Sequence, residues 1–142
     1  MTRVNIVPPS ELHDQHLIAE YREITMVPGS LNRTLRSKHG LVEEKISDTY
    51  TLNHGHVYFF YNKGLYLDKR YTELVSEMKS RGFHPNSNRK FPKSIFIDNG
   101  LYHDWTPSVK EQSIARERIQ QKIKMKPNWY RKNVNGQKTY IR

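Results

Sequence analysis

The sequence predicts a mainly α-helical fold, a single compact domain of three packed helices with long ordered loops and little or no sheet. A chain of 142 residues suits one domain with one hydrophobic core. Three segments carry apolar residues at helical spacing, whereas one short segment is β-prone. Aromatic residues make up 11% of the chain, which argues against disorder.

The first predicted helix begins near Asp14, a residue type favoured as an N-cap. Its apolar stripe consists of Leu17, Ile18, Tyr21 and Ile24. We expect Pro28-Gly29 to end or kink this helix. Helical spacing then resumes through Leu31 and Leu35 and stops at Gly40.

The second predicted helix has the clearest periodicity, carried by Leu67, Tyr71, Leu74, Val75 and Met78. Gly82 follows it as a typical residue just beyond a helix end. The third predicted helix opens with Thr106 as N-cap and Pro107 at the first helical position, and Pro127 ends it. Its buried line is Ala115, Ile119 and Ile123.

The remaining segments are irregular or ambiguous. Residues 56–61 are β-prone but isolated, so we expect an extended core segment or half of a small hairpin. Residues 83–105 carry Pro, Asn, Ser and Gly and predict a long ordered loop. One domain therefore spans residues 1–142, with an aromatic and basic C-terminal strap at 127–142.

Composition narrows the class of protein. The absence of cysteine excludes a disulfide scaffold, a thiol nucleophile and a cysteine-ligated metal. A net charge of +10 favours a polyanionic partner, nucleic acid first and an anionic membrane second. Apolar runs fall far short of the roughly 20 residues that span a bilayer, and the N-terminus lacks a signal-peptide core. We therefore expect an intracellular, cytoplasmic protein with no membrane partner.

One face of the first helix carries polar residues at three- and four-residue spacing: Gln15, His16, Ala19, Glu20, Arg22 and Glu23. A solvated helix surface would explain this pattern. Alternatively, Glu23 is a general acid/base, Arg22 beside it contacts an anion, and the small Ala19 leaves room for a ligand.

The third helix carries a basic stripe of Arg118, Lys122 and Lys126, spaced four apart with few acids nearby. The stripe faces either solvent or phosphates. In the strap, Trp129 and Tyr130 precede two cations, a combination that suits unstacked bases and phosphates. The alternative is that these rings pack the strap onto the core.

Metal and cofactor chemistry have little support in the sequence. His54 and His56 lack a third ligand at matching spacing, so we expect no metal site and no cofactor. The small Thr2 favours removal of the initiator Met1. Removal would expose an α-amino group with a pKa of about 7.7–8.0, which is a usable nucleophile when neutral.

Several blocks of sequence together resemble a known family. They are Met1–Asn5, Ser10–Glu23, Lys45-Ile46-Ser47, Gly55-His56-Val57, Phe59-Phe60-Tyr61, Arg81-Gly82-Phe83 and Pro127–Tyr130. They closely resemble the phage pyrimidine-dimer DNA glycosylases of the endonuclease V family. The resemblance covers nearly the whole chain, is most specific in the first two blocks, and is weak at 84–105.

The resemblance implies three packed helices and a bifunctional glycosylase/AP lyase mechanism. The N-terminal amine, here that of Thr2, would attack C1′ of the damaged nucleotide, form a Schiff base and nick the strand by β-elimination. Glu23 matches the family's catalytic carboxylate.

The resemblance also implies a monomer that binds damaged double-stranded DNA. The matching DNA-surface residues are Arg3, Gln15, His16, Arg22, Arg33, Arg118 and Lys122, to which the residue patterns add Trp129 and Tyr130. Met26 stands where the family prototype has an arginine, and Arg131-Lys132-Asn133 replace tyrosines of its tail.

The resemblance therefore implies a DNA repair enzyme of a bacterial or phage-infected cell. It would excise a damaged pyrimidine, that of a cyclobutane pyrimidine dimer, and nick the strand. Two alternatives remain: the same chemistry on another damaged or modified base, and a non-catalytic DNA-binding relative.

Overall fold

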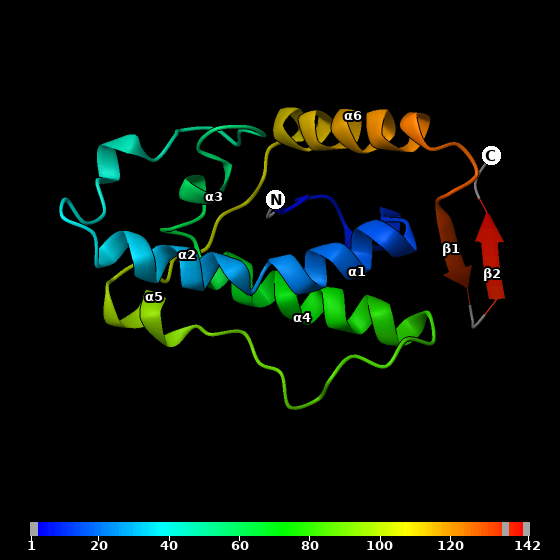
Figure 1. The fold of residues 1–142 in the computed structure, drawn as a ribbon, viewed down its shortest axis with the longest axis horizontal. Helices are drawn as coiled ribbons and strands as arrows, with labels where there is room; N and C mark the ends of the chain where they lie inside the picture. Colours follow the sequence, from blue (N-terminus) through cyan, green and yellow to red (C-terminus); the bar gives the residue numbers. More distant parts are fainter. Residues whose placement is uncertain (1–2, 135–136, 141–142) are drawn as a thin grey trace.

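A computed structural model describes residues 3–134 and 137–140 of the chain, and helices dominate it (Figure 1). The longest helical segments are α1 (Asp14–Glu23) followed by α2 (Met26–Leu35), α4 (Gly64–Ser80) and α6 (Val109–Met125). The shorter elements are η1 (Pro9–Glu11), η2 (Glu43–Lys45), α3 (His56–Phe59), α5 (Ser94–Asp98), β1 (Arg131–Val134) and β2 (Gln137–Tyr140). The predicted mainly α fold with little sheet is confirmed.

The first predicted helix is divided into α1 and α2. Asp14 is the first helical residue of α1 rather than its cap. The division falls at residues 24–25, so Pro28 lies inside the first turn of α2. A proline is tolerated there because first-turn N–H groups have no partner within the helix. α2 ends at Leu35, five residues before Gly40.

The end of α4 confirms the role predicted for Gly82, which has a φ of 90°. The amide of Gly82 donates to Lys79 O at 3.0 Å, and the amide of Phe83 donates to Met78 O at 3.0 Å. These two bonds form a Schellman motif, which satisfies carbonyls that have no partner within the helix. A residue with a side chain would be strained at this φ.

α6 begins two residues later than predicted. Ser108, not Thr106, is the N-cap: its hydroxyl accepts from Glu111 N at 3.1 Å, and the Glu111 carboxylate accepts from Ser108 N at 3.0 Å. This reciprocal capping box satisfies two backbone donors at once, an arrangement that needs Glu or Gln three residues after the cap. Ala115 and Ile119 are buried as expected, Ile123 is only partly buried, and the helix ends before Pro127.

The expectation of an extended segment at residues 56–61 is wrong. His56–Phe59 form α3, and Phe59 and Phe60 are almost completely buried. The β-propensity of aromatic residues reflects how well their side chains pack on a sheet. Here the side chains pack against the core from a helical backbone instead. The predicted loop at 83–105 also contains one short helix, α5, whose Phe96 is fully buried.

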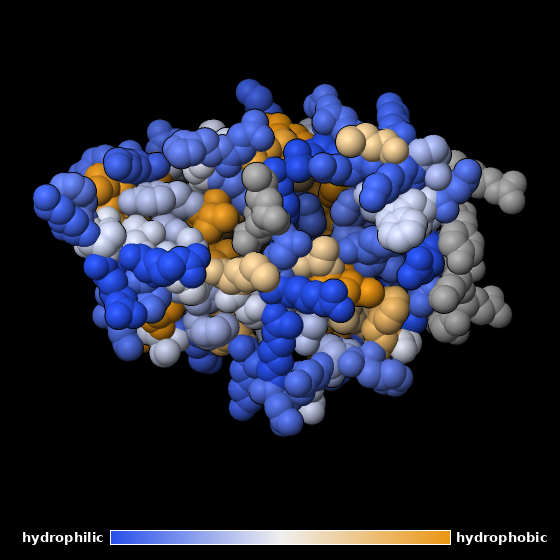
Figure 2. Space-filling model, viewed as in Figure 1, coloured by the Kyte–Doolittle hydropathy of each residue, from blue (hydrophilic) through white to orange (hydrophobic). Residues whose placement is uncertain are grey.

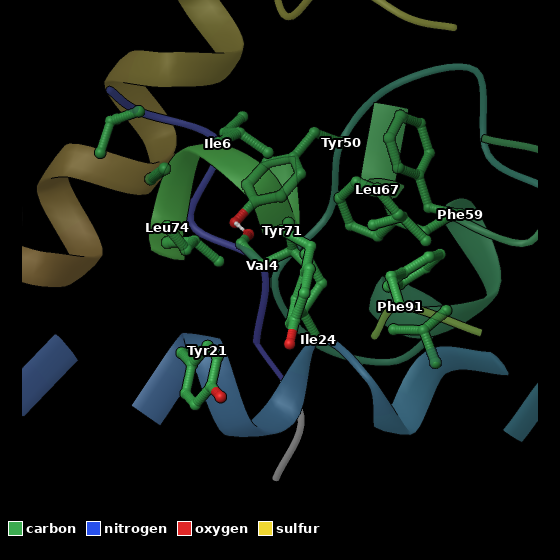
Figure 3. Close-up of a cluster of buried hydrophobic side chains, with 14 of the residues drawn as sticks. Val4, Ile6, Tyr21, Ile24, Tyr50, Phe59, Leu67, Tyr71, Leu74 and Phe91 are labelled. Atoms are coloured by element: carbon green, nitrogen blue, oxygen red, sulfur yellow. Dashed lines mark hydrogen bonds between the residues drawn. The ribbon is translucent and has the colours of Figure 1, made fainter. Parts of the chain in front are cut away.

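The N-terminal segment, residues 3–8, runs between α1 and α6 (Figure 1). Its aliphatic side chains Val4, Ile6 and Val7 are buried. Val4 and Ile6 join aromatic residues and side chains of α4 in the cluster drawn in Figure 3. The N-terminal segment is therefore part of the hydrophobic core.

The strap turns back toward α1. β1 pairs antiparallel with β2, with Arg131 opposite Tyr140. The side chain of Gln15 accepts from Arg131 N at 3.2 Å, and the carboxylate of Asp14 accepts from Asn133 N at 3.1 Å. The first turn of α1 thus binds β1 through backbone amides.

Helix α4 approaches α5 closely at Gly64. A Cβ at this glycine would lie 2.4 Å from Cγ of the buried Phe96. We predict that Gly64→Ala destabilises the protein by about 1–3 kcal/mol, because a well-packed core resists added volume. Urea-induced unfolding measures the change.

Gly29→Ala is the matched control, since its nearest neighbour would be 3.9 Å away and its φ is not positive. This second substitution should stabilise the protein by up to about 1 kcal/mol, because glycine lowers helix stability. Equal effects of the two substitutions would contradict the packing argument.

Candidate active site

A cavity of about 340 Å³ opens between α1, α6 and the N-terminal segment. Its lining residues are Arg3, Asn5, His16, Ala19, Glu20, Glu23, Arg118, Ile119, Lys122 and Tyr130. The small side chain of Ala19 lies among larger polar ones, as the polar face of the predicted helix suggested. The surface on this side of the molecule is mainly hydrophilic (Figure 2).

Glu23 at the end of α1 is bound to the N-terminal segment. Its Oε1 accepts from Arg3 N at 2.9 Å. Burial raises the pKa of Glu23 above its usual range, and the amide and charge of Arg3 partly oppose this rise. A carboxyl group whose pKa is raised toward neutrality is suited to exchange protons with a substrate.

Arg22, the neighbour of Glu23 on α1, is exposed and does not line the cavity. Neighbours in a helix point about 100° apart. The arginine whose positive charge lowers the Glu23 pKa is Arg3, from the N-terminal segment.

Glu20 lines the cavity and binds two other residues, Arg70 and Asn5. Its carboxylate accepts from Nε of Arg70 at 2.6 Å and from a terminal nitrogen of Arg70 at 3.0 Å. Asn5 donates to the same carboxylate from its backbone amide at 3.1 Å and from its side chain at 2.9 Å. The Glu20 and Arg70 side chains are almost fully buried, so their charges neutralise each other inside the protein.

Three cationic side chains line the cavity: Arg3, Arg118 and Lys122. Within the described residues, Nε and Nη1 of Arg3 are buried and have no hydrogen-bond partner. Burial and the nearby Arg118 lower the pKa of Arg3. Since Glu20 is paired with Arg70, three cations face the one remaining carboxylate, Glu23. The cavity is therefore suited to an anionic group such as a phosphate.

An aromatic wall closes one side of the cavity. Tyr130 stacks on His16, with ring centroids 4.7 Å apart and planes inclined by 18°. Burial lowers the pKa of His16 to about 4, with a smaller effect from His13. His16 is therefore neutral at neutral pH, and it contributes a flat, uncharged surface beside the cations.

The strap residues separate into two environments. Tyr130 is buried in the cavity wall, whereas Trp129 is 53% exposed and lies beside Lys126, whose Nζ is 5.5 Å from its ring centroid. Gln15, which we predicted at the DNA surface, donates to Trp129 O at 2.7 Å as well as accepting from Arg131. The strap thus carries one packed ring, Tyr130, and one exposed ring, Trp129, and the contact of Trp129 with DNA remains a prediction.

The remaining predicted site residues are not among the described residues that line the cavity. Arg33 is exposed on α2, and its contact with DNA remains a prediction. Thr2 lies outside the described residues. Residue patterns missed Asn5 and Ile119 as lining residues; the available signal for Asn5 was a polar residue between the buried Val4 and Ile6.

The described part of the chain contains no group of three or more His, Asp or Glu residues placed to hold a metal ion. None of its helices is long and apolar enough to cross a membrane.

The fold and the cavity define a small helical protein with a cation-lined site suited to an anionic group and a half-buried carboxyl group suited to acid–base chemistry. Residues 1–91 of the 142 match a family model described as pyrimidine dimer DNA glycosylase. The chain belongs to this family and is a DNA repair enzyme, which confirms the resemblance found in the sequence. The matched region includes Glu23, whereas Arg118, Lys122 and Tyr130 lie beyond it and complete the same cavity.

Proposed function

We propose that this protein is a bifunctional DNA glycosylase and AP lyase that acts on cyclobutane pyrimidine dimers in double-stranded DNA. The α-amino group of Thr2, exposed by removal of Met1, is the nucleophile. Glu23 is the acid/base residue.

The hydrogen bond from Arg3 N to Glu23 carries this proposal. Arg3 N belongs to the peptide bond formed with Thr2, so the carboxylate contacts the chain one residue from the proposed nucleophile. An α-amino group has a pKa of about 7.7–8.0, well below that of a lysine. The cation Arg3, the next residue in the chain, favours its neutral, nucleophilic form.

The proposed reaction begins at the amine. The amine attacks C1′, the glycosidic bond breaks, and its electron pair leaves with the base. Transfer of a proton to the sugar ring oxygen opens the ring and gives a Schiff base. Loss of a proton from C2′ then breaks the C3′–O bond and nicks the strand. Glu23 is suited to stabilise positive charge at C1′ and to move the proton that opens the ring.

The proposed DNA surface surrounds the cavity. Arg3, Arg118 and Lys122 bind phosphates at the reaction site, and His16 and Tyr130 form its aromatic wall. The exposed Arg22, Arg33 and Trp129 extend the surface along the duplex, and Gln15 joins it beside the strap.

Two rival functions remain. The same site could act on another damaged or modified base, and a non-catalytic relative could bind DNA through the same surface. Cleavage assays with irradiated, undamaged and abasic duplexes distinguish all three. Cleavage of irradiated and abasic duplexes supports the proposal, cleavage of the abasic duplex alone indicates another lesion, and binding without cleavage indicates a non-catalytic protein.

The amine nucleophile predicts a covalent adduct. Borohydride should trap the enzyme on abasic duplex, because reduction converts a Schiff base into a stable amine. Acetylating the N-terminus or retaining Met1 should abolish trapping while duplex affinity remains similar. Gel mobility of the adduct and N-terminal mass determination provide the measurement. Trapping that persists with a blocked N-terminus would indicate a lysine, with Lys122 in the cavity as the first candidate.

The carboxyl group of Glu23 can be tested separately. Glu23→Gln retains the shape and removes the charge, so we predict that base excision falls by roughly 10²–10⁴-fold and that nicking is strongly impaired. Affinity for damaged duplex should be retained or increased, because one negative charge leaves a phosphate-binding surface. Glu117→Gln, an exposed change on α6 outside the cavity, is the charge-matched control. Normal excision by the Glu23 variant would exclude the catalytic role.

The phosphate contacts predict a salt effect. Arg118→Ala should weaken binding to all duplexes similarly and reduce the slope of log affinity against log salt concentration by about one. Lys124→Ala is the control, since Lys124 lies about 200° around α6 from Lys122 and does not line the cavity. Filter binding at several salt concentrations measures both slopes. An unchanged slope for the Arg118 variant would assign that side chain to solvent.

A further inference from the structure

The backbone of the N-terminal segment is held by side chains from distant parts of the protein. Arg3 N donates to Glu23, and Asn5 N donates to Glu20. Farther along, Ile6 O accepts from Gln112 at 3.2 Å and Val7 O accepts from Arg70 at 2.6 Å. The segment belongs to no helix or strand, so these bonds fix its path.

Both backbone groups of Val4 are held by one pair of residues, Tyr50 and His56. Val4 N donates to Nε2 of His56 at 3.0 Å. The hydroxyl of Tyr50 donates to Val4 O at 2.8 Å, the bond drawn as a dashed line in Figure 3. Val4 is fully buried, so water does not replace either partner.

The bond pattern defines the state of His56. Its Nδ1 lies 2.6 Å from Thr51 O, and a carbonyl oxygen can only accept, so Nδ1 carries the proton. Nε2 is then the lone-pair nitrogen that receives Val4 N–H. Burial lowers the pKa of His56 to about 4, which maintains this neutral form at neutral pH.

Tyr50 is itself fixed from α6. Its backbone amide donates to the Glu111 carboxylate at 2.7 Å, and the other oxygen of Glu111 completes the capping box of that helix. The ring of Tyr50 packs edge-on against His56, with centroids 5.3 Å apart. The start of α6 therefore sets where Tyr50 and His56 hold the N-terminal segment.

We propose that Tyr50 and His56 are positioning residues that hold Val4, and through it the amine nucleophile, in register with Glu23. This inference rests on the proposed function. An atom two residues from Val4 lies within roughly 7 Å of it, so holding Val4 limits where the amine can be. Amine and C1′ must approach within about 3–3.5 Å in the correct orientation, and an error of about 1 Å can cost roughly 100-fold in rate.

The test is single-turnover borohydride trapping on an abasic duplex, which isolates amine attack from base excision. Tyr50→Phe removes one hydroxyl and keeps the ring, and we expect trapping to slow by about 5-fold while the Kd for duplex changes less than about 2-fold. His56→Leu removes both polar contacts and should slow trapping by about 100-fold. His56→Gln should recover part of the rate, because its amide oxygen can accept from Val4 N.

Tyr61→Phe is the matched control. Tyr61 is as buried as Tyr50, at 3% exposure, and its hydroxyl binds Ser30 at 2.6 Å instead of the N-terminal segment. It should lower the melting temperature about as much as Tyr50→Phe without slowing the trapping step. Equal trapping rates for the two variants would overturn the inference, as would rate and duplex affinity falling together. If the unsubstituted protein traps no duplex, the proposed function fails, and the positioning role fails with it.

Discussion

The buried ion pair between Glu20 and Arg70 is the interaction on which the rest of the structure depends. It joins α1 to α4, and it also holds the N-terminal segment through Asn5 and Val7. Removing two charges from water is costly, and the cost is offset here because the carboxylate accepts four hydrogen bonds from two residues. Losing either partner of such a pair typically costs about 3–5 kcal/mol. This pair therefore fixes the positions of Glu20 and Asn5 in the cavity lining.

The chemistry of the cavity follows from the neutralisation of Glu20. Glu20 and Glu23 lie three residues apart on α1, and only Glu20 has a buried arginine partner. Among the described residues, Glu23 instead accepts from the backbone amide of Arg3, and burial raises the pKa of Glu23. Three cations on the same cavity then favour a negatively charged substrate while the carboxyl group remains able to move protons. One helix face thus supplies a structural carboxylate and a candidate catalytic one.

Local sequence patterns predicted the helices well where the residues that form and end a helix lie within or next to that helix. The apolar periodicity of α4 and the glycine that ends it were both readable, because they depend on residues within a few turns. Predictions from local sequence were wrong where a side chain binds or packs against residues that are distant in the sequence. Asp14 does not cap α1 because its carboxylate binds Arg81 and the amide of Asn133. Residues 56–59 form a helix because their rings enter a core that the local sequence does not describe.

The sequence by itself determined the helical class, the basic charge, the family and the candidate catalytic residue Glu23, since these depend on residue type, spacing and matching blocks. Only the tertiary structure decided that Arg3 rather than Arg22 acts on that carboxylate. It also decided that Tyr50 and His56 hold Val4, and that Tyr130 is buried while Trp129 is exposed. The physical reason is that hydrogen bonds, burial and charge effects act over a few ångströms in space, whereas residues that they join, such as Asp14 and Asn133, can be 119 positions apart in the chain.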